Sequence, residues 1–381
     1  MHESLETSEL IRLVRKVFRP RDEDRTMALL TDLPDDRLPD NAEWAERRAL
    51  VADWHRRLLE ARGELGLDAV RLVCYRNVRR NNADLPAEGW IVEGGEPPEH
   101  ADRVGAGSVP LEQVFRDHRL LIAATELSAT APMKLNAPRY GFRAATMPGF
   151  TREMVPALKL DWEEIHGRCA DLKELLDRTV AATLRFEASG KETELIVDLR
   201  HRQATASGGL VTEPGTAGNL PSCETYIVPY EGEHEGDPSR TCGTLPLELD
   251  GELLSCRIHA NRVVEVEGSG PVADRERREI EAEPAYSNVA ELGFGLLADY
   301  GIRPVGRILL DEKLALHIAF GRSDHFGGQV GADDFSSPDK VVHIDRVYLP
   351  EVQPRVKILS VDLVPGENAE TIPLIRNGKY L

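Results

Sequence analysis

The stretches TMALLTDL (Thr26–Leu33) and DAVRLVCY (Asp68–Tyr75) determine the fold class that the sequence predicts. Both are short apolar runs, and the first ends at Pro34, as a buried strand does. Between them, Asn41–Leu65 has the charged, amphipathic pattern of a long helix, with Asn41 as a suitable N-cap. A strand, a helix and a strand in this order imply parallel pairing. We therefore expect an α/β N-terminal domain with a layered, mostly parallel sheet.

The same alternation continues along the first half of the chain. The segment Arg79–Gly107 is rich in Gly, Pro, Asn and Glu, which indicates a surface excursion. The remaining expected elements are the helices Leu5–Phe18 and Asp161–Thr183 and the strands Arg119–Thr125 and Arg143–Met147.

The second half has a different pattern, in which strand-like segments follow one another with Gly- and Asn-containing turns between them. The pair Asp250-Gly251 between two apolar runs is a hairpin signal. Helices are expected to interrupt the strands at Asp274–Ala282 and Asn288–Tyr300. We place the domain boundary near residue 180, with the α/β domain over 1–180 and an α+β, largely antiparallel domain over 181–381.

Charge and composition restrict the partners and the location. The chain has 65 acidic and 47 basic residues and a net charge of -18, a field that repels nucleic acid and anionic lipid. The basic clusters Arg12–Arg25 and Arg76–Arg80 lack interleaved aromatic residues for stacking. No apolar run approaches the roughly 20 residues that span a bilayer, and the N-terminus lacks the pattern of a secretory signal. The five cysteines form no CxxC pair, so we expect a cytoplasmic protein without a disulfide framework.

Carboxylates and imidazoles stand in apolar surroundings in four segments of the second half, and they are Glu224, Glu291, Glu312 with His317, and His343 with Asp345. Each alone could be a hydrogen-bonded core residue. Together they offer only oxygen and nitrogen ligands, which suit Zn, Mn, Co or Fe. His343 and Asp345 are separated by one residue, so on a strand they share a face. Such a set can hold two ions roughly 3.5–4 Å apart.

The four segments, taken in order, resemble the aminopeptidase T family of dimetal exopeptidases. GNLPSCETYIVP (218–229) is similar to the family's Asn-x-Pro-x-x-Glu-Val-Phe-x-x-Pro block, and AELGFGL (290–296) to its Gly/Ala-Glu block. LLDEKLALHIAFG (309–321) is similar to its Asp-Glu-(x)4-His-Ile-Ala-x-Gly block, and VVHIDRV (341–347) to its His-x-Asp block. The resemblance covers roughly residues 120–350.

The resemblance implies that two divalent ions (Zn, Co or Mn) are bound or surrounded by Glu224, Glu291, Glu312, His317, His343 and Asp345. Such a site activates a bridging water that attacks the N-terminal peptide bond, so a metallo-aminopeptidase is expected. One of the three glutamates would be the general base, and the sequence leaves open which. The family also implies a homodimer with an enclosed cavity, which would admit short peptides. A specialised small-amide substrate is equally compatible.

Two positions depart from the family pattern. Cys223 precedes Glu224 where the family usually has Gly or Glu, and it is either a small core thiol or a substrate contact. Some members carry a Tyr seven residues after the motif histidine as a transition-state hydrogen-bond donor. This chain has Asp324 there, followed by His325, which either replaces the donor as a catalytic residue or has no role.

Two other functions compete with the hydrolase. A related branch resembles Fe(II)-dependent, ring-cleaving dihydroxypyridine dioxygenases, which use two His and one carboxylate. That branch has His at the position of Glu291 and lacks the acidic residue at Glu224, so retention of both favours the hydrolase. The third possibility is a binding protein with a degenerate site.

Overall fold

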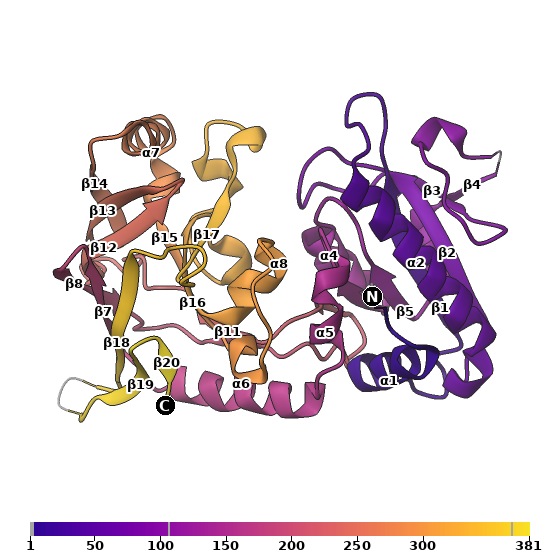
Figure 1. The fold of residues 1–381 in the computed structure, drawn as a ribbon, viewed down its shortest axis with the longest axis horizontal. Coiled ribbons are helices and arrows are strands. Elements are labelled where there is room, and N and C mark those ends of the chain that lie inside the picture. Colours follow the sequence, from indigo (N-terminus) through magenta and orange to yellow (C-terminus); the bar gives the residue numbers. More distant parts are fainter. Residues whose placement is uncertain (1–3, 106, 367–368) are drawn as a thin grey trace. The chain divides into compact units, whose positions relative to one another are not determined.

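The computed structural model describes residues 4–105, 107–366 and 369–381, and the chain forms two compact units (Figure 1). The first unit comprises Met1–His166 and Ser207–Ser222, and the second comprises Gly167–Ala206 and Cys223–Leu381. The chain therefore passes between the units three times, whereas the sequence predicts a single boundary near residue 180.

The first unit contains a seven-stranded sheet with the order β10-β6-β5-β1-β2-β3-β4. Its parallel strands are β1 (Thr26–Leu33), β2 (Ala69–Arg76), β5 (Leu120–Ala123), β6 (Arg143–Thr146) and β10 (Thr216–Asn219). The antiparallel strands at one edge are β3 (Glu88–Ile91) and β4 (Ser108–Pro110). The mostly parallel sheet confirms the expected α/β class. The segment expected as a surface excursion contributes β3.

Helices pack against this sheet in the pattern that strand–helix alternation predicts. They are α1 (Thr7–Phe18), α2 (Ala42–Glu60), α3 (Leu111–Asp117), α4 (Thr130–Tyr140) and α5 (Val155–Leu158). Asn41 caps α2, since its side chain accepts a hydrogen bond from the backbone N–H of Trp44 at 2.9 Å. Helix α2 lies against β1 and β2, and α3 and α4 pack on Ala28 and Leu30 of β1.

The second unit contains an eight-stranded antiparallel sheet with the order β14-β13-β12-β8-β7-β18-β19-β20. Its strands are β7 (Ala181–Ala188), β8 (Lys191–Asp198), β12 (Cys242–Leu249), β13 (Glu252–His259), β14 (Arg262–Glu267), β18 (Val356–Val364), β19 (Ile372–Arg376) and β20 (Lys379–Tyr380). Asp250 and Gly251 form the turn between β12 and β13, as the hairpin signal predicts.

A five-stranded sheet with the order β17-β16-β15-β11-β9 carries the residues of the candidate site. Its strands are β9 (Thr205–Ser207), β11 (Glu224–Ile227), β15 (Val289–Gly295), β16 (Leu316–Gly321) and β17 (His343–Val347). Strands β11, β15, β16 and β17 pair antiparallel. The helices of this part are α6 (Trp162–Leu176), α7 (Pro271–Ala282) and α8 (Ile308–Asp311). The ring centres of Phe186 on β7 and Tyr348 after β17 are 4.9 Å apart, so side chains from the two sheets pack against each other here.

Two expected helices differ from the structure. The helix expected over Asp161–Thr183 ends at Leu176, because Val180 donates a backbone hydrogen bond to the carbonyl of Val364 at 2.8 Å and so enters a sheet. The helix expected over Asn288–Tyr300 is wrong, because Val289–Gly295 forms β15. All seven residues of this strand are buried, so its sequence lacks the apolar–polar alternation that indicates a strand. Pairing with neighbouring strands on both sides makes this segment a strand.

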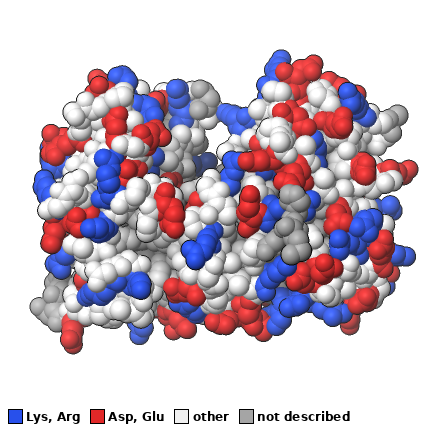
Figure 2. Space-filling view, viewed as in Figure 1, with Lys and Arg blue, Asp and Glu red and all other residues white. Residues whose placement is uncertain are grey.

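Among the described residues, no helix has both the length and the apolar character needed to cross a membrane. Figure 2 shows acidic and basic side chains interspersed over the visible face. On this face, the acidic residues are thus spread over the surface and do not form one negative patch.

Candidate metal centre

One face of the five-stranded sheet carries the predicted ligands. Residues directly opposite each other in antiparallel strands point to the same face. Glu224 on β11 is opposite Gly295 on β15, and Gly293 on β15 is opposite His317 on β16. Because Gly293 and Gly295 are two residues apart, Glu224 and His317 lie on the same face.

The remaining ligands join this face by the same rule. Glu291 is opposite Ala319, and Ala319 is opposite Asp345 on β17. His343 lies two residues before Asp345, so both point to the face of Glu291. The fold thus brings five of the predicted ligands together, from four strands that are far apart in the sequence.

Two glycines on β15 make room for this arrangement. A Cβ added to Gly293 would lie 1.9 Å from Nε2 of His317, so the imidazole can extend across β15 only over a glycine. A Cβ added to Gly295 would lie 2.2 Å from the carbonyl carbon of Lys313. This second glycine therefore lets the turn Glu312–Leu314 approach the sheet beside Glu224.

The ligand atoms form two groups that share one carboxylate. In the first, Nε2 of His317 lies 3.1 Å from Oε1 of Glu291 and 3.6 Å from Oε2 of Glu224. In the second, Nε2 of His343 lies 3.5 Å from Oε2 of Glu291 and 3.6 Å from Oδ1 of Asp345. Glu291 directs one oxygen to each group, as a carboxylate that bridges two ions does.

The orientation of the two imidazoles fits a cation. Nδ1 of His317 lies 3.2 Å from the carbonyl oxygen of Ala315, and Nδ1 of His343 lies 2.7 Å from that of Arg322. A carbonyl only accepts, so each Nδ1 carries the proton and each Nε2 directs its lone pair toward carboxylates. Such a contact is repulsive unless a second proton or a metal ion lies between. Oε2 of Glu224 is buried and has no hydrogen-bond partner among the described residues. These donors fit a divalent ion with nitrogen and oxygen ligands.

Without an ion, the same charges shift the pKa values of the groups. Burial lowers the pKa of His317, but the hydrogen bond and charge of Glu291 outweigh it and raise the pKa to about 9. Burial raises the pKa of Glu291, but hydrogen bonds from His317 and His343 outweigh it and lower the pKa to about 2. Opposing burial, the charges of Asp345 and Glu291 raise the pKa of His343 well above its ordinary value. Protons therefore occupy the positions for which metal ions compete.

Glu312 lies outside both groups, and its carboxylate pairs with the ammonium of Lys313. Lys313 is 2% exposed and also donates a hydrogen bond to Oε1 of Glu224 at 2.6 Å. Burial raises the pKa of Glu312 to about 8, although the charge of Lys313 opposes this shift. Sequence reasoning missed Lys313, whose signal is a lysine inside the apolar motif of Glu312 and His317.

His325 lies near the second group, on the turn Asp324–Phe326. Its ring is 5.4 Å from that of His343 and nearly perpendicular to it, and its side chain is 34% exposed. Burial and the charge of His343 lower the pKa of His325, so its imidazole is neutral at pH 7. Asp324 accepts two hydrogen bonds from Arg322 at 2.5 and 3.2 Å.

Cys223 is buried and packs away from the ligand face. Its Sγ lies 3.9 Å from Sγ of Cys169 on α6. Since neighbouring residues of an extended chain alternate in direction, Cys223 and Glu224 point to opposite sides. This position fits the interpretation of Cys223 as a small core thiol.

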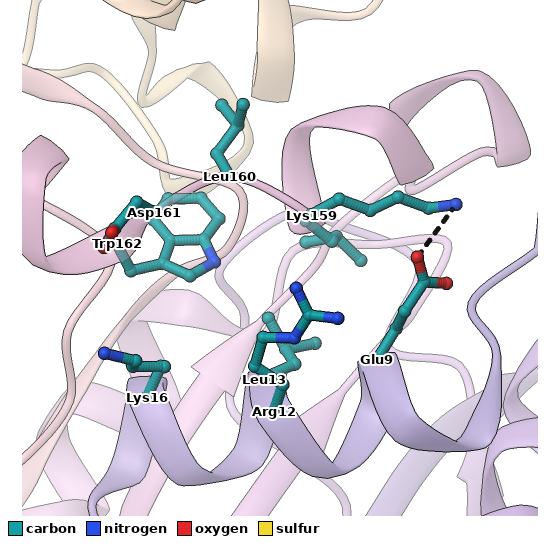
Figure 3. A pocket seen from close by; sticks show the side chains of 9 residues that line it. Glu9, Arg12, Leu13, Lys16, Lys159, Leu160, Asp161 and Trp162 are labelled. Carbon is teal, nitrogen blue, oxygen red and sulfur yellow. Dashed lines mark ion pairs between the residues drawn. The ribbon is translucent and has the colours of Figure 1, made fainter.

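Other polar clusters lack the features of this centre. His201, His234 and Asp237 lie close together, but two of them are exposed and Arg200 donates to Asp237 at 2.7 and 3.0 Å. The first unit has a similar group at Asp36, His100 and Asp102, and it is also largely exposed. A pocket of about 130 Å³ in the first unit is lined by charged side chains, including an ion pair of Glu9 and Lys159 at 3.4 Å (Figure 3). None of its lining residues belongs to a described metal-ligand group.

Comparisons with known proteins show which fold this chain shares. No protein-family model and no curated protein matches the chain. Its structure is similar to that of 2,5-dihydroxypyridine dioxygenase from Pseudomonas putida KT2440, with a TM-score of 0.61 and 13% identity over 99% of this chain and 98% of that one. It is also similar to AmpT from Thermus thermophilus, with a TM-score of 0.53 and 18% identity over 98% of this chain and 99% of that one. At these identities the likeness shows a common fold, and the residues of the site must distinguish the reactions.

Proposed function

We propose that this protein is a metal-dependent aminopeptidase that removes the N-terminal residue of short peptides. The observation that carries the proposal is the position of Glu291, whose two carboxylate oxygens face two separate ligand groups. A facial triad for one Fe(II) needs only two imidazoles and one carboxylate. Here three carboxylates and two imidazoles converge, which supports a site for two ions. The similarity to AmpT accords with the aminopeptidase T motifs of the sequence.

The residues of the site divide into ligands and a proton acceptor. The ions would be held by Glu224, Glu291, His317, His343 and Asp345. When bound, two divalent ions supply an acidic water and polarise the carbonyl oxygen of the substrate. We assign the general base to Glu312, which is partly buried, lies outside both ligand groups and has its pKa raised to about 8. Lys313 orients Glu312 and Glu224 by donating to both.

Metal analysis combined with two activity assays tests the proposal. Protein stripped with a chelator is reloaded with Zn, Co, Mn or Fe(II), and the bound ions are counted. We expect two ions per chain, and release of p-nitroaniline from leucine p-nitroanilide but not from its N-acetylated form, because the site acts on a free N-terminus.

The alternative function is tested in the same preparation. The similarity to the dioxygenase favours an assay with 2,5-dihydroxypyridine under oxygen. Oxygen uptake by protein with one Fe(II) per chain, without anilide hydrolysis, would overturn the aminopeptidase proposal. If the variant His343→Ala keeps both its bound ions and its turnover, a catalytic role for the whole site is excluded.

A further inference from the structure

Tyr226 lies on the same face of the sheet as the predicted ligands. It is two residues after Glu224 on β11, so the two side chains point the same way. Tyr226 is opposite Gly293, and Gly293 is opposite His317. The imidazole of His317 extends over Gly293 of β15 and therefore lies beside the side chain of Tyr226. Tyr226 is 7% exposed.

The surroundings hold this side chain in place on the ligand face. The ring packs against Phe326 with 4.8 Å between the ring centres. Thr205 on β9 makes a side-chain hydrogen bond with the phenol. Burial and the charges of Glu291 and Glu224 raise the pKa of the Tyr226 phenol. At pH 7 a phenol keeps its proton, so Tyr226 carries one O–H that can donate.

Amide hydrolysis requires such a donor. Negative charge develops on the carbonyl oxygen of the scissile bond, and an oriented hydrogen-bond donor stabilises it. Two of the three N–H groups of Lys313 donate to Glu224 and Glu312. The side chain of Asp324 accepts hydrogen bonds from Arg322. Tyr226 is a neutral donor on the ligand face, and it stands on a strand paired with β15, where the scaffold fixes its position, whereas the neutral imidazole of His325 lies on a turn.

We propose that Tyr226 is a further catalytic residue, whose phenol donates a hydrogen bond to the carbonyl oxygen of the substrate as the tetrahedral intermediate forms. The phenol keeps its proton throughout, so no bond to it forms or breaks. This inference rests on the proposed aminopeptidase function. It assigns to β11 two roles two residues apart, a metal ligand at Glu224 and a donor to the oxyanion at Tyr226.

The variant Tyr226→Phe tests the inference, because it removes the hydroxyl and keeps the ring. We expect kcat for leucine p-nitroanilide to fall by about 100-fold, as for loss of one oxyanion donor, with KM changed less than about 3-fold. Metal content and the shape of the pH–rate profile should stay as in the wild type. The matched control is Tyr286→Phe, since Tyr286 is also 7% exposed and its hydroxyl bonds to Glu276 and Arg346 instead. The control should keep the wild-type kcat.

A binding measurement supplies a readout that does not depend on turnover. A phosphinic pseudodipeptide, which carries a tetrahedral anionic centre, should bind Tyr226→Phe about 100-fold more weakly by calorimetry, whereas free leucine should bind equally. Thr205→Val, at an exposed position, covers the case that Tyr226→Phe does not fold, and it should lower kcat to a smaller extent.

The outcomes separate this inference from the proposed function. Wild-type kcat in Tyr226→Phe would overturn the catalytic role and leave the aminopeptidase intact. Loss of bound ions together with activity would also overturn it, because Tyr226 would then only position Glu224. If the wild-type protein does not hydrolyse the anilide, the proposed aminopeptidase function is refuted, and with it the role of Tyr226. The wild-type assay alone gives this result, without the variants.

Discussion

Replacement of Lys313 by Met should destabilise the metal-free protein much more than the metal-loaded protein. Lys313 is 2% exposed, and its ammonium pairs with Glu312 and donates to Glu224 at 2.6 Å. Met fills a similar volume without charge. The variant Lys313→Met therefore leaves one buried carboxylate, Glu224, and one partly buried carboxylate, Glu312, without their common cation.

The expected loss follows from the cost of an unpaired buried charge. Removing one partner of a buried ion pair costs about 3–5 kcal/mol. The pKa of Glu312 is already raised to about 8, and without Lys313 it should rise further. A carboxyl group with a raised pKa in the folded state stabilises the fold less as the pH rises through that value. We therefore expect the full loss near pH 9 and a smaller loss near pH 6, where Glu312 is protonated.

Urea unfolding followed by circular dichroism measures this effect at both pH values, with and without saturating Mn²⁺. Bound ions should restore part of the stability, because they supply the missing positive charge. The control Lys357→Met removes an exposed cation that pairs with Glu187, and it should leave the unfolding midpoint unchanged. A loss below about 1 kcal/mol at pH 9, or an equal loss with and without ions, would refute the role given to Lys313.

Three further variants test separate parts of the structure. Glu312→Gln should lower kcat by about 100-fold or more while the bound ions, counted by mass spectrometry, remain, because it removes the assigned base and no ligand. Gly293→Ala places a methyl group 1.9 Å from Nε2 of His317, so ion content after dialysis should fall below that of the wild type. In the first unit, burial raises the pKa of Asp32 to about 6 from 3.8, so its contribution to stability should fall by about 3 kcal/mol between pH 4 and 7. Asp32→Asn should flatten that slope in urea unfolding, and an unchanged slope would contradict the assignment.

The candidate ligands were predictable because their chemistry is local. A carboxylate such as Glu291 in an apolar run stands out in the sequence, and the spacing of His343 and Asp345 places both on one face of a strand. The strand that carries Glu291 was not predictable in the same way. It is buried on both faces and contains Gly293 and Gly295, so its pattern lacks the alternation that indicates a strand.

Lys313 and Tyr226 show a different limit of sequence reasoning. Lys313 follows Glu312 directly, and only the close approach of its turn to Gly295 brings its ammonium to Glu224. Tyr226 stands two residues after Glu224, so the spacing places both on one face of a strand, but an aromatic residue there indicates core packing. Only the pairing of β11 with β15 and of β15 with β16 brings Tyr226 beside His317. The neighbours of Lys313 and Tyr226 thus depend on tertiary contacts that the sequence does not encode.

The charges of the site imply that it forms before any ion binds. The acidic side chains are Glu224, Glu291, Glu312 and Asp345, and the groups that can be positive are His317, His343 and Lys313. With both imidazoles protonated, as their raised pKa values allow, the buried charges nearly balance, so the metal-free sheet can fold. Binding of ions must then displace two imidazole protons, whereas the ammonium stays. Metal affinity should therefore weaken as the pH falls below about 9, and the site should lose its ions in acid without unfolding of its sheet.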